Sequence, residues 1–159
     1  MLKLIFLDID GVLNGSSTKE RIERYVGVDS NKLSLLKQIL DATNAKIVLV
    51  STWKEYWYKE PQRKKKQDFL ANYLDKRMSE FNLKISDKTD NYYMVNRGEG
   101  IKEYIANLKH LGIEVSNYII IDDEIFDYLS TKMTKKLVRT SFKNGLQEKH
   151  VKKAIAMLS

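Results

Sequence analysis

KLIFLDIDGVLNG, residues 3–15, is the stretch on which the fold prediction depends. Its apolar run, Leu4 to Leu7, is continuous, which is typical of a strand buried on both faces. The run then ends in Asp8, Asp10 and Gly11. Two carboxylates this close repel each other unless a positive charge lies between them. The stretch therefore predicts a buried strand whose carboxyl end gathers positive charge.

The composition is that of a globular protein. The chain has 159 residues, of which 43% are hydrophobic, and this suits a single domain spanning residues 1–159. It has no cysteine, so disulfides and thiolate zinc sites are excluded. No apolar run is long enough for a membrane span, and the first one is too short for a signal peptide. We therefore expect a cytoplasmic protein with no membrane partner.

The net charge of +7 favours encounter with polyanions, and nucleic acid is the partner this suggests. A lysine-rich composition without such a partner is the alternative. The one charge run, RKKK at 63–66, reads either as the solvated start of a helix or as a phosphate-contacting patch. The oligomeric state is left open.

Apolar runs alternate with amphipathic stretches along the whole chain, which predicts an α/β fold with a parallel sheet covered on both faces. We expect Ser30 to cap the first helix and Gly112 to close the third. The expected strands are 3–9, 46–51, 83–86, 117–124 and 136–139. The expected helices are 31–42, 62–82, 98–111 and 146–158, with Phe69, Leu70, Tyr73, Leu74 and Phe81 facing inward on the second.

Polar side chains follow the strands at the edge where a doubly wound sheet binds its ligands. Acids, hydroxyls and a guanidinium are predicted to meet there: Asp8, Asp10, Ser51, Thr52, Arg97, Asp122 and Asp123. Mg²⁺ can bridge carboxylate and phosphate oxygens, and hydroxyl and cationic groups can hold the remaining phosphate oxygens. This set therefore indicates phosphoryl transfer with Mg²⁺ as cofactor.

Four motifs in order resemble those of the haloacid dehalogenase-like (HAD) phosphohydrolases: DIDGVLN, IVLVST, RGEGI and IIIDDE. A narrower resemblance, through VSTWK and TSFKNGL as well, is to a small uncapped HAD subgroup associated with nucleic-acid repair proteins. The resemblance implies a three-layer Rossmann-like fold. The segment between Gly11 and residue 31 has room only for a flap, and the segment between Ser51 and Arg97 reads as a helix and a strand, so we expect no large cap.

The resemblance also implies roles for the first two motifs. Asp8 is the nucleophile that forms an aspartyl-phosphate, and Asp10 is the general acid and base. Gly11 leaves room for backbone beside the phosphate. The Ser51 hydroxyl and the nearby Thr52 amide bind the transferring phosphate, although a Ser here also serves as an ordinary helix cap.

Arg97 is expected to offset the charge of phosphate and nucleophile, because it opens a helix where anion sites form. Lys102, five residues later, is the competing cation. Asp122 is expected to ligate the metal together with Asp8 and the carbonyl of Asp10. Asp123 is expected to lie outside the direct coordination of the metal, or to contact it through a water molecule.

The aromatic cluster after Ser51 has two interpretations. Trp53, Tyr56, Trp57 and Tyr58 could stack a nucleobase, or they could pack a helix on the sheet. We take Trp53 as the substrate-binding candidate among them. Asn14 is placed either at the start of a substrate-facing flap or in an ordinary turn.

The function predicted from the sequence is Mg²⁺-dependent hydrolysis of a phosphomonoester, with a nucleotide or nucleic-acid end phosphate as substrate. The alternatives are a phosphatase of a small metabolite or a phosphoprotein, and a non-catalytic module that binds a phosphorylated end. A receiver-like signalling domain fits less well, because receivers carry the phosphorylated aspartate on a later strand.

Overall fold

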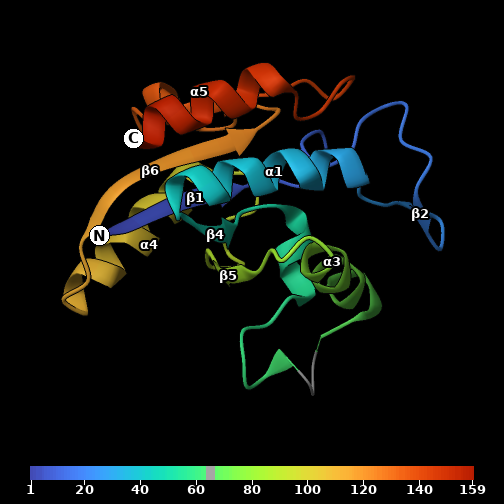
Figure 1. Cartoon of the computed structure of the whole chain (residues 1–159). Helices are drawn as coiled ribbons and strands as arrows, with labels where there is room; N and C mark the ends of the chain where they lie inside the picture. The colour runs from blue at the N-terminus through green and yellow to red at the C-terminus, as the bar shows by residue number, and fades with distance from the viewer. Residues whose placement is uncertain (64–66) are drawn as a thin grey trace.

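β1 (Leu2–Leu7) lies at the centre of a parallel sheet in the computed structural model, which describes residues 1–63 and 67–159. The strand order is β5-β4-β1-β6-β7. β4 and β5 therefore lie on one side of β1, and β6 and β7 lie on the other. The other strands are β4 (Lys46–Leu49), β5 (Ile85–Lys88), β6 (Val115–Asp122) and β7 (Leu137–Arg139). Since all five strands are parallel, their carboxyl ends meet along one edge of the sheet (Figure 1).

Helices cover both faces of this sheet. α1 (Ser30–Thr43), α3 (Phe69–Ser79) and α5 (Glu148–Leu158) pack on the face that carries Ile5 and Leu7. α4 (Arg97–His110) packs on the opposite face, against Leu4 and Phe6. Alternate residues of β1 thus enter two separate cores, as the period of a strand requires. The predicted three-layer α/β arrangement is confirmed.

Two predicted helix starts were wrong. Asp29, and not Ser30, is the N-cap of α1. Within the helix predicted over 62–82, α3 begins at Phe69, where the Asp68 side chain caps it by accepting a hydrogen bond from the Ala71 N–H. Phe69, predicted to face inward, is 49% exposed. Of the charge run at 63–66, residues 64–66 lie outside the described part of the chain.

The two segments that a HAD cap would occupy are a short hairpin and a longer stretch that belongs to the core. Between β1 and α1 there is a hairpin of β2 (Arg21–Ile22) and β3 (Tyr25–Val26), which we call the flap. Between β4 and α4 lie the short 3₁₀ helix η1 (Thr52–Tyr56), α3 and β5. β5 pairs with β4 in the main sheet, so this segment is part of the core. The expectation of no large cap is confirmed.

A second 3₁₀ turn, η2 (Thr134–Lys136), leads into β7. Throughout the described residues, every helix is too short or too polar to span a bilayer.

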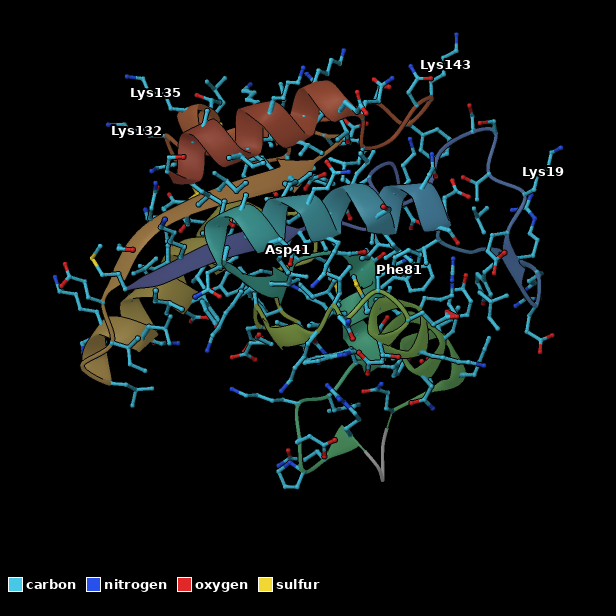
Figure 2. The ribbon with its side chains drawn as sticks, in the orientation of Figure 1. Lys19, Asp41, Phe81, Lys132, Lys135 and Lys143 are labelled. Atoms are coloured by element: carbon cyan, nitrogen blue, oxygen red, sulfur yellow. The ribbon has the colours of Figure 1, made fainter. Side chains whose placement is uncertain are left out.

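Lysine side chains project from both ends of the molecule. Lys19 and Lys143 lie at the end where the strands finish, and Lys132 and Lys135 lie at the other (Figure 2). The positive charge is therefore spread over the surface and not confined to the edge of the sheet that carries the acids.

Candidate active site

Asp8 stands directly after β1, at the carboxyl edge of the sheet. Its backbone N–H donates to the Ile121 carbonyl at 2.9 Å, and the residue is only 4% exposed. The chain then turns sharply at Gly11, whose φ is +80°. A Cβ at this position would collide with the Asp123 carboxylate, so only glycine allows the loop to pass so close to the acids. The Thr140 hydroxyl fixes the turn by donating to the Gly11 carbonyl at 2.6 Å.

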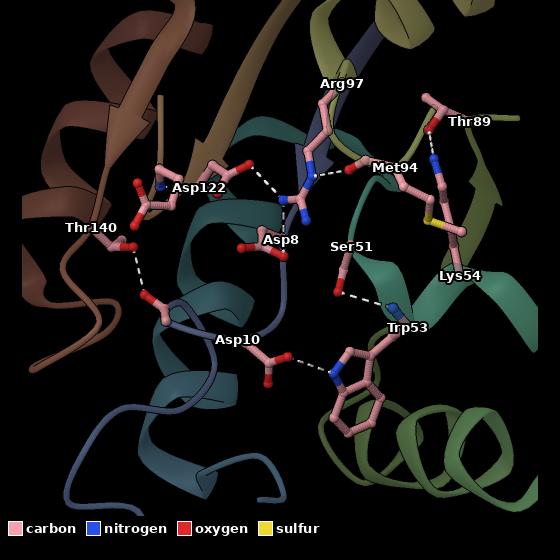
Figure 3. Close-up of polar contacts among 12 residues, drawn as sticks. Asp8, Asp10, Ser51, Trp53, Lys54, Thr89, Met94, Arg97, Asp122 and Thr140 are labelled. Carbon is pink, nitrogen blue, oxygen red and sulfur yellow. Dashed lines mark hydrogen bonds and ion pairs between the residues drawn. The ribbon is translucent and has the colours of Figure 1, made fainter. Parts of the chain in front are cut away.

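Arg97 is the cation that faces these acids (Figure 3). Its Nη1 lies 3.2 Å from Oδ1 of Asp8 and 2.8 Å from Oδ2 of Asp122. The Nε donates to the Met94 carbonyl at 3.1 Å, and the Phe126 ring lies 4.1 Å from the guanidinium carbon. Burial by itself lowers the pKa of Arg97, but the two carboxylates outweigh burial and raise it. The guanidinium is thus charged and held on three sides.

Asp122, at the end of β6, is fully buried and accepts three hydrogen bonds. Arg97 and the Tyr128 hydroxyl both donate to Oδ2 at 2.8 Å, and the Glu124 N–H donates to Oδ1 at 3.2 Å. A carboxylate offers about four lone-pair positions. Asp122 therefore has about one left for any further partner.

Asp8, Asp122 and Asp123 form a carboxylate cluster, each offering an oxygen within 4.8 Å of the others. Burial, followed by the repulsion of Asp122, raises the pKa of Asp8 well above its ordinary value, although Arg97 opposes the shift. The pKa of Asp123 is also raised, again by burial and by Asp122. One guanidinium does not neutralise three acids. The cluster thus fits a hard divalent cation such as Mg²⁺, which prefers carboxylate oxygens.

Asp10 lies on the other side of the loop and is held by two donors. The Asn14 amide donates to Oδ1 at 3.0 Å, and the Trp53 indole donates to Oδ2 at 3.1 Å. Asn14 is buried, and it also accepts from the Gly11 N–H and donates to the Gly27 carbonyl, both at 2.9 Å. Asn14 therefore does more than form an ordinary turn, because its side chain links Asp10 to Gly27, the residue that follows the flap.

Ser51 follows β4 and is buried beside the cluster. Its Oγ accepts from the Trp53 N–H at 3.2 Å, so it does cap η1. A hydroxyl that accepts one hydrogen bond can still donate its proton to another acceptor, so capping does not exclude phosphate binding. Thr52 is exposed at the mouth of the cleft described next.

A cleft of about 690 Å³ opens beside Asp10. The flap forms one wall, and η1 with the start of α3 forms the other. We call it the aromatic cleft, after the rings that line it: Tyr25, Trp53, Tyr56, Phe69 and Phe142.

The sequence matches, over residues 4–151, the family described as "HAD domain in Swiss Army Knife RNA repair proteins". The chain belongs to this family. The predicted resemblance is confirmed in both its general and its narrower form, and membership indicates a phosphohydrolase-type domain. A comparison with curated proteins finds no match.

Within this HAD domain, the cation at the acids is Arg97, and Lys102 lies elsewhere. Lys102 is exposed on α4. Five residues correspond to about 140° beyond one full turn of a helix, which carries Lys102 away from the side that Arg97 occupies. The structure thus places Arg97, and not Lys102, in contact with Asp8.

Lys54 is a site residue that the sequence reasoning missed. It is fully buried, and its Nζ donates to the Thr89 hydroxyl at 2.7 Å and to the carbonyls of Asp90 and Tyr93 at 3.0 and 2.6 Å. Burial, followed by the positive charges of Arg97 and Lys88, lowers its pKa to about 8. Lys54 therefore ties η1 to the loop that leads into α4, and so sets the place of Arg97.

The aromatic residues after Ser51 divide into two groups. Trp57 is fully buried and donates to Asp75, so packing accounts for it. The Lys88 ammonium lies over the Tyr58 ring, with Nζ 4.7 Å from the ring centre. Of the four aromatic residues that follow Ser51, only Trp53 and Tyr56 line the aromatic cleft.

Proposed function

We propose that this domain is a Mg²⁺-dependent phosphomonoesterase that works through an aspartyl-phosphate on Asp8, with a nucleotide or nucleic-acid end phosphate as substrate. The observation that carries the proposal is the pairing of two unlike acids. Asp8 is buried in a carboxylate cluster facing Arg97, whereas Asp10 is exposed and lines an open cleft. Two carboxylates in different environments suit two different roles.

In the first step, a carboxylate oxygen of Asp8 attacks phosphorus and forms a new P–O bond. The bond from phosphorus to the ester oxygen breaks, and Asp10 gives that oxygen its proton. Asp10, now ionised, takes a proton from a water molecule. The water oxygen attacks the same phosphorus, the bond to Asp8 breaks, and inorganic phosphate leaves.

Arg97 and Ser51 are proposed to hold the phosphate oxygens. Arg97 forms an ion pair with Asp8 at 3.2 Å, so it lies beside any phosphate that reaches this carboxylate. The Ser51 hydroxyl has a proton to donate, and the Thr52 N–H lies next in the chain. Such fixed donors stabilise the charge that develops on phosphorus oxygens in the transition state.

Mg²⁺ bound here would neutralise the acids and polarise the phosphate. We propose Asp8, Asp123 and the carbonyl of Asp10 as its principal ligands. Asp122 remains a ligand candidate, but three hydrogen bonds already occupy its oxygens. Its main proposed task is therefore to hold Arg97.

The proposal is tested by hydrolysis of a generic aryl phosphate with added Mg²⁺. We expect turnover that chelation by EDTA abolishes. Asp8→Asn should lower the rate by about 10³-fold or more, as removal of a covalent nucleophile does.

Asp41→Asn is the matched control, because the Asp41 side chain is 63% exposed on α1 and, among residues 1–63 and 67–159, is paired only with Lys37 (Figure 2). It should keep full activity. Activity that survives Asp8→Asn would show that Asp8 is not the nucleophile. Mg²⁺-dependent binding of phosphorylated ligands without turnover across a broad panel would instead support a non-catalytic binding module.

A further inference from the structure

The aromatic cleft exposes large rings that come from four separate parts of the chain. Tyr25 on β3 is 39% exposed, Tyr56 on η1 52%, Phe69 on α3 49%, and Phe142 after β7 58%. A monomeric protein rarely gathers exposed apolar rings in one place without a ligand or partner for them. The volume of the aromatic cleft, about 690 Å³, lies within the ordinary range for small-ligand sites, about 300–1,000 Å³.

Contacts between the two walls preform the cleft. The Tyr25 and Phe69 rings lie 6.2 Å apart and join the flap to α3. The Tyr73 hydroxyl on α3 accepts from the Val28 N–H at 3.1 Å, just after the flap. Trp53 is fixed between Asp10, which accepts its indole N–H, and the Tyr73 ring at 6.5 Å.

Asp10 connects the cleft to the chemistry. It is the acid proposed to protonate the leaving oxygen, and it lines the cleft. The group that leaves with that oxygen must therefore lie in the cleft. A wall of aromatic rings suits a flat ring system, and stacking on aromatic side chains accepts any base.

The charges in and around the cleft fit a nucleotide better than an apolar peptide. Glu55 lines the cleft, and a carboxylate accepts hydrogen bonds from the amino groups of bases. Arg24 lines it from the flap and can meet a neighbouring phosphate. A base paired in a duplex is already stacked and bonded, so the occupant must be unpaired.

We infer that the aromatic cleft binds the terminal base of a single-stranded nucleic-acid end, stacked on Tyr25 and Phe69, while the terminal phosphate of that nucleotide reaches Asp8. This inference rests on the proposed phosphatase function, which sets the orientation of the bound nucleotide. It adds that the enzyme reads an unpaired base, and that the flap and the start of α3 recognise it.

The test compares two tetranucleotides that carry the same terminal phosphate, at whichever end is hydrolysed. In one the terminal nucleotide keeps its base, and in the other it is abasic. We expect the abasic substrate to lose about 5- to 150-fold in kcat/KM, the loss that follows removal of one stacked base. A duplex with the same blunt end should also be a poorer substrate than the single strand.

Phe69→Ala and Tyr25→Ala should shrink the ratio between the base-bearing and abasic substrates towards one. Tyr92→Ala is the matched control, because Tyr92 is an exposed ring, at 79%, that does not line the cleft. It should leave the ratio unchanged. Circular dichroism spectra and thermal unfolding establish that each variant is folded.

Binding without turnover separates this inference from the proposed function. The probe is a fluorescein-labelled tetranucleotide without a terminal phosphate, followed by anisotropy in EDTA. If binding depends on the terminal base and on Phe69 while no phosphate ester is hydrolysed, the cleft inference holds and the phosphatase proposal fails.

If esters are hydrolysed equally well with and without a base, the phosphatase proposal holds and the cleft inference is overturned. It is also overturned if sedimentation shows self-association that Phe69→Ala abolishes, since a second copy of the chain would then cover the rings.

Discussion

Asn14 uses its whole side-chain amide to hold the loop after β1. Its oxygen accepts from the Gly11 N–H, and its nitrogen donates to Asp10 and to the Gly27 carbonyl. Asn14→Ala leaves a buried N–H and a buried carbonyl without these partners. We expect a loss of about 1–3 kcal/mol in the free energy of unfolding, measured in urea, together with a lower kcat because Asp10 is no longer held.

Asn72→Ala is the control for this variant, since Asn72 is exposed on α3 and its side-chain nitrogen donates a long hydrogen bond, 3.5 Å, to the Gln67 carbonyl. It should change neither quantity. An Asn14→Ala enzyme with normal kcat would show that the hydrogen bond to Asp10 has no role in placing the acid.

Lys54 gives the stability of the protein a predictable dependence on pH. Its pKa falls from 10.5 to about 8, chiefly through burial. Between these values the unfolded chain binds more protons at Lys54 than the folded chain, so its contribution to the free energy of unfolding rises with pH. The burial penalty is fully present below pH 8 and disappears above pH 10.5.

The measurement compares wild type with Lys54→Met in urea at pH 7.5 and pH 9.5. Lys54→Met should be the less stable at both pH values, because Thr89 and two carbonyls lose their donor. The gap between the two proteins should widen at pH 9.5. A gap that narrows as pH rises would mean that the pKa of Lys54 is not lowered.

Lys54 also marks the limit of what the sequence could predict about the site. Asp8, Arg97 and Asp122 each stand at the end of a strand or the start of a helix, so the alternation of strands and helices was enough to predict that they meet at one edge of the sheet. The partners of Lys54 lie 35 to 39 residues away in the chain. Pairings over such distances leave no periodic signal, and a lysine after a strand reads as an exposed charge.

At the scale of elements, the strands and helices were predicted well because apolar runs mark them directly. The exceptions include the hairpin of β2 and β3, which was not predicted, the strand expected at 83–86, which is Ile85–Lys88, and the start of α3. Asp68 caps the start of α3, which lies inside the range 62–82 that the apolar spacing had predicted as one helix. The exposure of Phe69 follows from the same fact, since it occupies the first helical position beside the flap and not the middle of a buried face.

Tyr73 is one of the residues of α3 that hold the flap, beside Arg77, which donates to the Val28 carbonyl at 3.2 Å, and removal of one oxygen atom tests its part. Tyr73→Phe removes the acceptor of the Val28 N–H and the hydroxyl that lies 3.3 Å from Glu20. We expect faster hydrogen exchange of the amides at 20–28, from a loss of about 1 kcal/mol in local opening free energy. For a base-bearing substrate, KM should rise more than kcat falls.

Tyr92→Phe tests whether loss of any tyrosine hydroxyl has this effect, since Tyr92 lies 79% exposed in another loop. Exchange at 20–28 should match wild type in this control. Unchanged exchange in Tyr73→Phe would place the anchor of the flap elsewhere, with the Tyr25–Phe69 contact as the next candidate.

At the scale of the whole molecule, the fold stabilises an arrangement of charges that is unfavourable without a cation. Three carboxylates converge where the central strands end, and two of them, Asp8 and Asp122, are buried. Because the pKa of Asp8 is raised, its contribution to stability is present at low pH and is lost as pH rises through the raised value. At neutral pH the metal-free domain therefore carries a penalty that the fold must offset elsewhere.

Asp8→Asn should remove this penalty and abolish the response to Mg²⁺ at the same time. In EDTA at pH 7.5 we expect the variant to melt about 2–4 °C above wild type, equivalent to about 1 kcal/mol for a chain of this size. Mg²⁺ at ten times its Kd should raise the Tm of wild type by a similar amount, since binding to the folded state then contributes about 1.4 kcal/mol. Asp41→Asn should follow wild type in both conditions, because Asp41 lies outside the cluster. A metal-free Asp8→Asn protein less stable than wild type would mean that the ion pair with Arg97 outweighs the repulsion among the acids. The cluster would then no longer imply a cation.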